Sequence, residues 1–299
     1  MAPRTVSKSL AETLCDTGRL LLAAGNAWVD DRASSMGAAL AYYTLFSLAP
    51  LLLIAVSVAG LVFGEEAARG ELYDQLVGLV GPASAVTVQE MLESLNVPQK
   101  GVVGTLIGLV VMAVGATTVF AELRSAIDHI WRAPVAAPSG GLFSWLRVRL
   151  LSLGLVLGIG FLLMVSLVVS AALSAFSHWA TPWFGHDVLL AASTFNVIVS
   201  LLFVMGLFAM LYKWLPHVHL AWRDVWIGAG AAAILFTAGK WLIGLYIGRS
   251  GVTSVFGAAA SLVVLMLWVY FSAQIFLFGA EITSVYAHRH GSLRGQRPM

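Results

Sequence analysis

The chain alternates between long apolar stretches and short polar segments. Six stretches contain no Asp, Glu, Lys or Arg, and they are 33–64, 101–121, 150–186, 188–212, 225–239 and 250–280. A helix needs about 20 apolar residues to cross roughly 30 Å of hydrocarbon, and five of the six stretches are that long. The stretch 225–239 reaches the length only if Lys240 is included and the helix continues to Ile247. The pattern predicts a polytopic membrane protein.

The predicted fold class is all-α. Lipid leaves only helices and closed barrels as spanning structures, and barrel strands alternate apolar and polar residues. The run Leu150–Val169 does not alternate. We therefore predict a six-helix transmembrane domain over residues 33–286. Its spans are expected at about 33–63, 101–121, 148–175, 187–212, 224–248 and 252–286.

The first span has Pro50 near its middle. Proline removes a backbone hydrogen bond and predicts a helix kink there. The segment 65–100 then reads as two short external amphipathic helices, broken at Gly81-Pro82.

The two ends of the chain carry different expectations. Residues 1–32 predict a cytoplasmic amphipathic helix at the membrane interface, with a disordered leader as the alternative. The apolar run Leu20–Val29 is not expected to be a secretory signal, because nineteen residues precede it and two Asp follow. Residues 287–299 are predicted to be a disordered cytoplasmic tail.

Composition supports a membrane protein, and charge gives its orientation. Hydrophobic residues make up 59% of the chain and charged residues 11%, far from soluble averages. In the six-span arrangement one side holds thirteen Lys and Arg, whereas the other holds only Arg69, Lys100 and Arg249. Basic loops stay in the cytoplasm, so both termini are predicted there. A five-span arrangement, which rejects the Lys240 span, would place the basic tail outside.

Motifs of several enzyme classes are absent from the sequence. It contains no GxxxxGK[ST] phosphate-binding loop, no HExxH and no GxSxG. Two HxH pairs occur, His217 with His219 and His288 with His290, but no carboxylate cluster accompanies them. Metal sites need three or four convergent ligands. We expect no metal, no cofactor and no enzymatic activity.

Three motifs carry a resemblance to a known family. They are Ala38-Ala39-Leu40-Ala41-Tyr42-Tyr43-Thr44-Leu45-Phe46-Ser47-Leu48-Ala49-Pro50, Phe120-Ala121-Glu122-Leu123-Arg124 with Ile130-Trp131, and Tyr212-Lys213-Trp214-Leu215-Pro216. Together with Gly257 and the run from Gln274 through Gly279-Ala280-Glu281, they resemble the YihY/BrkB family, once labelled ribonuclease BN. The resemblance covers about residues 30–286. It implies the bacterial inner membrane, six spans, cytoplasmic termini and a transport role for lipids or lipid-linked molecules of the envelope.

The ribonuclease label is not supported by the residues. Hydrolysis of RNA needs a metal cluster or a positioned acid–base pair, together with a basic surface. The basic segments are short and lack clustered ligands, and the bias of cytoplasmic loops explains their charge. We expect no nucleic-acid partner, and the resemblance supplies no catalytic residues.

Ionisable residues at the predicted cytoplasmic helix ends are the first group of site candidates, because burying charge in a membrane is costly. An ion-pair network is expected there, with a gate or proton site as the alternative. In it Glu122 or Glu281 would pair with Arg32, Arg124 or Arg223. The members are Arg32, Glu122, Arg124, Asp128, Arg223 and Glu281.

Lys240 is the second candidate, since it is the one basic residue well inside an apolar stretch. In one interpretation it binds an anionic headgroup in a cavity, assisted by Asn196 and Arg249, with Gln274 deeper. In the other its long stem simply carries the ammonium to the outer interface.

Two functions follow as alternatives. The first is an ATP-independent transporter or flippase for a lipid, lipid-linked or anionic envelope substrate. The second is a non-transporting scaffold that binds an envelope protein through the acidic segment 65–100. Membrane lipids are partners in both, and an oligomer is compatible with either.

Overall fold

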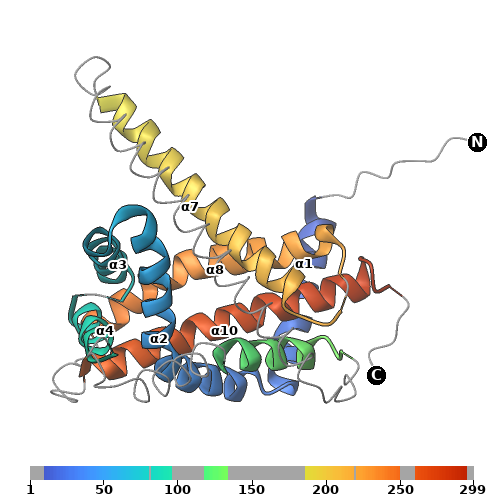
Figure 1. Cartoon of the computed structure of the whole chain (residues 1–299). Helices are drawn as coiled ribbons and strands as arrows, with labels where there is room; N and C mark the ends of the chain where they lie inside the picture. The colour runs from blue at the N-terminus through green and yellow to red at the C-terminus, as the bar shows by residue number, and fades with distance from the viewer. Residues whose placement is uncertain are drawn as a thin grey trace, which may run out of the picture.

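The computed structural model describes residues 10–80, 82–95, 118–133, 186–218, 220–249 and 260–294, and every regular element in these ranges is an α-helix. The described part of the chain is therefore all-helical, as predicted. The predicted span 148–175 and most of the span 101–121 lie outside the described residues. The labelled helices (Figure 1) are α1 (Leu10–Asp30), α2 (Ala33–Phe63), α3 (Glu65–Val80), α4 (Pro82–Leu95), α7 (His186–Trp214), α8 (Trp222–Arg249) and α10 (Ala260–Arg289). Residues 118–130 form a further helical segment.

Two of the described helices are long and apolar enough to cross a membrane. They are the stretch Val197–Trp214 of α7 and the whole of α10, Ala260–Arg289. Length and composition are the basis of this finding, and six spans remain an expectation.

The first predicted span coincides with one helix. α2 covers Ala33–Phe63, and Gly64 follows with a φ of 87°. Glycine adopts this positive-φ conformation without the steric cost that other residues would meet, so the chain can turn at once into α3. α2 also changes direction along its length (Figure 1), as a kink at Pro50 would produce.

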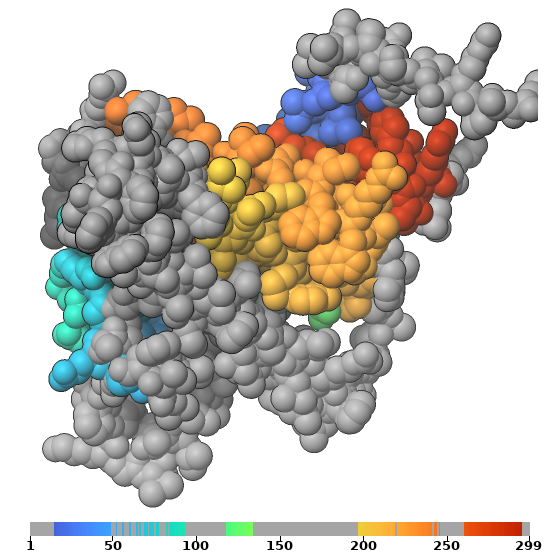
Figure 2. Space-filling model, turned by 90° about the horizontal axis from the view of Figure 1, so that it is seen from above, coloured from blue at the N-terminus to red at the C-terminus, as the bar shows by residue number. Residues whose placement is uncertain are grey.

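α10 is the central helix of the described structure. It packs against α8, α2 and α1, and Figure 1 shows it running through the middle of the arrangement. In the space-filling view, α1 lies against the last part of α10, and α7 and α8 lie side by side at the surface (Figure 2). Ala24 of α1 is fully buried, whereas Leu21 is 44% exposed. α1 therefore packs on the helical core as well as presenting an apolar face.

Small residues let α8 and α10 approach closely. A Cβ atom built on Gly279 would lie 2.7 Å from the Cβ atom of Ala232, and one built on Gly228 would lie 2.7 Å from the Gly279 carbonyl oxygen. Real Cβ atoms do not come this near, so both glycines are required by the packing. Small residues serve this purpose between membrane helices.

The helices α3 and α4 lie at the Ala260 end of α10. Ser84 Oγ donates a hydrogen bond to the Ser261 carbonyl oxygen over 3.3 Å, and Thr87 Oγ1 donates to Ser261 Oγ over 2.8 Å. Val88 and Leu265 form a small buried cluster beside these contacts. α4 is thus fixed to one end of α10, and α1 lies at the other.

Candidate functional site at the Arg289 end of α10

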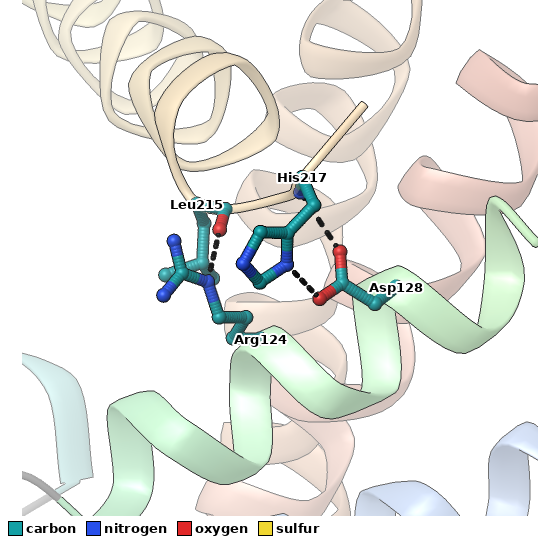
Figure 3. Close-up of polar contacts among 4 residues, drawn as sticks. All are labelled: Arg124, Asp128, Leu215 and His217. Carbon is teal, nitrogen blue, oxygen red and sulfur yellow. Dashed lines mark hydrogen bonds and ion pairs between the residues drawn. The ribbon is translucent and has the colours of Figure 1, made fainter. Parts of the chain in front are cut away.

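The second and third sequence motifs meet at the loop that follows α7. Arg124 Nε donates to the Leu215 carbonyl oxygen over 2.8 Å. The Asp128 carboxylate accepts from the His217 backbone N–H over 2.9 Å and lies 2.7 Å from His217 Nδ1. Figure 3 shows both side chains reaching from one helical segment to the loop. α7 ends at Trp214 and Pro216 has no N–H, so the loop backbone needs such outside partners.

The same motifs are also bonded to α10. Tyr212 is completely buried, and its hydroxyl donates to the Phe276 carbonyl oxygen over 2.7 Å. Trp131 Nε1 donates to the Ala280 carbonyl oxygen over 3.2 Å, and the Trp131 and Tyr212 ring centroids lie 6.4 Å apart. Burying such rings is favourable only when their polar atoms find acceptors. The motif residues thus join the segment 118–133, α7 and α10 at one place.

A buried charged cluster lies beside this junction. Asp31, at the turn between α1 and α2, is 7% exposed, and Glu281 of α10 is 2% exposed. Arg132 Nη2 lies 2.7 Å from Asp31 Oδ1, and the Asp31 carboxyl group lies close enough to Glu281 to act on it electrostatically. We call Asp31, Arg132 and Glu281 the acidic-pair cluster.

Backbone geometry at the cluster is unusual. Arg132, which follows the helical segment 118–130, has a φ of 50°, and Arg32, which precedes α2, has a φ of 53°. This left-handed conformation costs a non-glycine residue roughly 1–2 kcal/mol. At Arg132 the turn places the guanidinium against Asp31, and the ion pair offsets part of that cost.

The structure changes the expected ion pairs. The positive charge beside Glu281 is Arg132, which the sequence had not singled out, rather than Arg32, Arg124 or Arg223. Arg124 instead donates a hydrogen bond from Nε to the Leu215 carbonyl oxygen, and the Asp128 carboxylate pairs with the His217 side chain. Asp31 and Arg132 are 101 residues apart, so sequence spacing could not pair them. The feature of the sequence that could have indicated this pair is that Asp31 and Arg132 each lie just after the end of a helix.

The remaining candidates of the predicted ion-pair network are more exposed than the acidic pair. Arg32 and Arg223 are exposed, and Glu122 is half-buried. Across the described ranges, no three His, Cys, Asp or Glu side chains converge as metal ligands would.

The candidates around Lys240 are placed as follows. Lys240 is exposed on α8, whereas the side chains of Asn196 and Arg249 lie outside the described residues. Gln274 packs against the first turns of α2, where its Nε2 lies 3.3 Å from the Ser34 carbonyl oxygen and 2.0 Å from a Cβ built on Gly37. Exposure of Lys240 is compatible with both interpretations given above.

The chain beyond α10 folds back on α8. Asp224, which is 2% exposed, accepts from the Ser292 backbone N–H over 2.8 Å and from Ser292 Oγ over 2.7 Å. His290 Nε2 lies 3.5 Å from Asp16 Oδ2 of α1. The sequence predicted a disordered tail over residues 287–299. In the structure α10 continues past Tyr286 to Arg289 and Ser292 is bonded to α8, whereas residues 295–299 lie outside the described residues.

Comparisons with known proteins place the chain in a family. The family described as "Virulence factor BrkB" matches residues 25–299. The chain therefore belongs to the BrkB family, which confirms the resemblance drawn from its motifs.

Curated relatives agree with this placement. A UPF0761 membrane protein of Pseudomonas paraeruginosa is 30% identical over 258 residues, which are 85% of this chain and 59% of that protein. A UPF0761 membrane protein of Tolumonas auensis is 29% identical over 276 residues, 90% of this chain and 86% of that protein. The chain thus spans about three-fifths of the Pseudomonas relative's length. No solved structure matches it. The protein is a membrane protein of this family.

Proposed function

We propose that this member of the BrkB family is a six-span protein of the bacterial inner membrane, with both termini in the cytoplasm. In this role it moves a lipid, lipid-linked or anionic envelope substrate across the membrane without ATP. It is not an enzyme, and it uses no metal or cofactor.

The observation that carries the transport role is the acidic-pair cluster. Glu281 is an ionisable group on an apolar helix that is long enough to span a membrane, and it is 2% exposed. Burying such a group is expensive, and groups of this kind within membrane helices mark ion or substrate pathways. If the contact between these helices were purely structural, well-packed apolar side chains would stabilise it at least as well.

The orientation rests on independent features that agree. The acidic-pair cluster, the loop after α7 and the C-terminal end of α10 lie together. Six basic residues lie in or beside these segments, and they are Arg124, Arg132, Lys213, Arg223, Arg289 and Arg294. Basic segments stay in the cytoplasm. The acidic helices α3 and α4 lie at the opposite end of α10, which would then face outward.

A second candidate function is a membrane scaffold. Where the structure describes the side chains of α3 and α4, four acidic residues are exposed, and they are Glu66, Asp74, Glu90 and Glu93. Because α4 is bonded to α10 through Ser84 and Thr87, these helices present a fixed acidic surface. Such a surface suits a basic region of an envelope protein.

Reconstitution of the purified protein in liposomes separates the two functions. Fluorescent analogues of phosphatidylglycerol and phosphatidylcholine are placed in both leaflets, and a membrane-impermeant reductant then bleaches the outer one. A transporter exposes inner-leaflet lipid to bleaching, with the anionic lipid moving faster. If no candidate lipid or anion moves, and a stable envelope partner is recovered with the protein, the scaffold replaces the transporter.

A further inference from the structure

The Glu281 carboxyl group is buried without enough partners for a carboxylate. It is 2% exposed, and its Oε1 atom has no hydrogen-bond partner within the part of the chain that the structure describes. The carboxyl group of Asp31 lies close enough to act on it electrostatically, because Trp131 is bonded to Ala280 and the adjacent Arg132 is paired with Asp31. An ionised carboxylate with an unsatisfied oxygen would cost far more than a neutral carboxyl group in this position.

Few charges are available to balance the pair. Among the described residues, the charged groups that act on Glu281 are Asp31, Arg132 and Asp30. Arg132 is already paired with Asp31 at 2.7 Å, and its side chain is 43% exposed. Three other titratable groups around this end of α10 have partners of their own. Tyr212 donates to Phe276, Asp224 accepts from Ser292, and His288 Nδ1 contacts the Ser284 carbonyl oxygen.

Two carboxyl groups can share a hydrogen bond only when one of them carries a proton, because a carboxylate only accepts. We propose that Asp31 and Glu281 together form a binding site for a single proton. With the proton bound, Glu281 donates to Asp31, and Asp31 keeps its ion pair with Arg132. The net charge of the cluster is then zero.

Release of the proton would leave two negative charges in contact beside one half-exposed guanidinium. Their repulsion in a poorly solvated place acts between α10 and the turn that joins α1 to α2. The site can therefore favour one arrangement of these helices when protonated and another when ionised. Proton coupling of transport through this step rests on the proposed function, whereas the proton site itself does not.

Infrared spectroscopy of the full-length protein in detergent at pH 7 tests the site, since a protonated carboxyl group has its own carbonyl band. Glu281→Gln leaves Asp31 ionised beside Arg132. Asp31→Asn leaves Glu281 next to an unshared Arg132, which favours its ionisation. We expect either change to remove the band of one protonated carboxyl group, and Asp128→Asn, which alters the nearby His217 contact, to retain it.

Two results would overturn the proposal. One is a wild-type spectrum at pH 7 without a protonated carboxyl band. The other is an unchanged band in whichever of the two variants folds. Neither result depends on a substrate, so a failure of lipid movement in liposomes counts against the proposed function and leaves the proton site standing.

Discussion

Trp131 Nε1 and the Ala280 carbonyl oxygen lie 3.2 Å apart and are separated by 149 residues in sequence. The contact brings the end of the helical segment 118–130 against the part of α10 that holds Glu281. Arg132, the next residue, forms the ion pair with Asp31. One indole hydrogen bond therefore positions a charge at the buried carboxyl pair.

Arg132 should be coupled energetically to Asp31. Arg132→Met leaves Asp31 buried without its cation, so we expect it to destabilise the protein more than Arg132→Met combined with Asp31→Asn. A double-mutant cycle from unfolding in detergent should give a coupling energy of about 1–3 kcal/mol. Strictly additive effects of the two substitutions would show that the contact does not stabilise the fold.

The close approach of α8 and α10 makes Gly279 sensitive to enlargement. In Gly279→Ala the new methyl group would lie 2.4 Å from Tyr212 Oη and 2.7 Å from the Cβ atom of Ala232. We expect a loss of about 1–3 kcal/mol in thermal unfolding. Gly206→Ala on α7 is the matched control, because no atom of the described residues lies within 4 Å of its new Cβ and alanine favours helix. Equal stability of the two variants would contradict this packing.

The loop after α7 should depend on Asp128. Asp128→Ala removes the acceptor of the His217 backbone N–H, and the loss of one charge-assisted hydrogen bond is worth about 1.5–3 kcal/mol. Hydrogen exchange of the His217 amide should therefore accelerate at least tenfold. Ser125→Ala, at an exposed position of the same segment, should leave the exchange rate unchanged. A similar rate in wild type and Asp128→Ala would mean that the loop is held by other contacts.

Lys240 should matter for transport and not for folding. It is exposed, so Lys240→Met should change stability by less than about 0.5 kcal/mol. If the ammonium attracts an anionic headgroup, the liposome assay should show markedly slower movement of the anionic lipid, and Lys240→Arg should retain activity. Full activity in Lys240→Met would leave Lys240 as a residue that only reaches the interface.

Topology can be tested with the native cysteine. Cys15 on α1 is exposed and is the one cysteine of the chain. With cytoplasmic termini, an impermeant maleimide added to sealed cells should not label Cys15. In a Cys15→Ser background it should label Asp74→Cys, on an exposed position of α3. External labelling of Cys15 in sealed cells would reverse the predicted orientation.

The sequence alone determined the helical class, the family and the bounds of several helices, because these depend on local information. α2 occupies Ala33–Phe63, the residues predicted from the stretch without charges. Arg32 and Glu65 flank this stretch, and Gly64 permits the turn that ends it. The length of an apolar run and the position of a glycine can both be recognised in the sequence itself, without knowledge of how the helices pack.

Tertiary structure alone decided which polar groups meet. The predicted positions of the helix ends suggested that Glu281 would pair with Arg32, Arg124 or Arg223. The packing of the helices instead placed Glu281 near Asp31 and Arg132. It also turned Arg124 and Asp128 toward the loop that contains Leu215 and His217, and it folded Ser292 back onto Asp224. Such pairs are fixed by the rotation of each helix about its axis and by the direction in which a chain leaves a helix end. Those quantities are set by the packing of all the helices together, so no single segment of the sequence contains them.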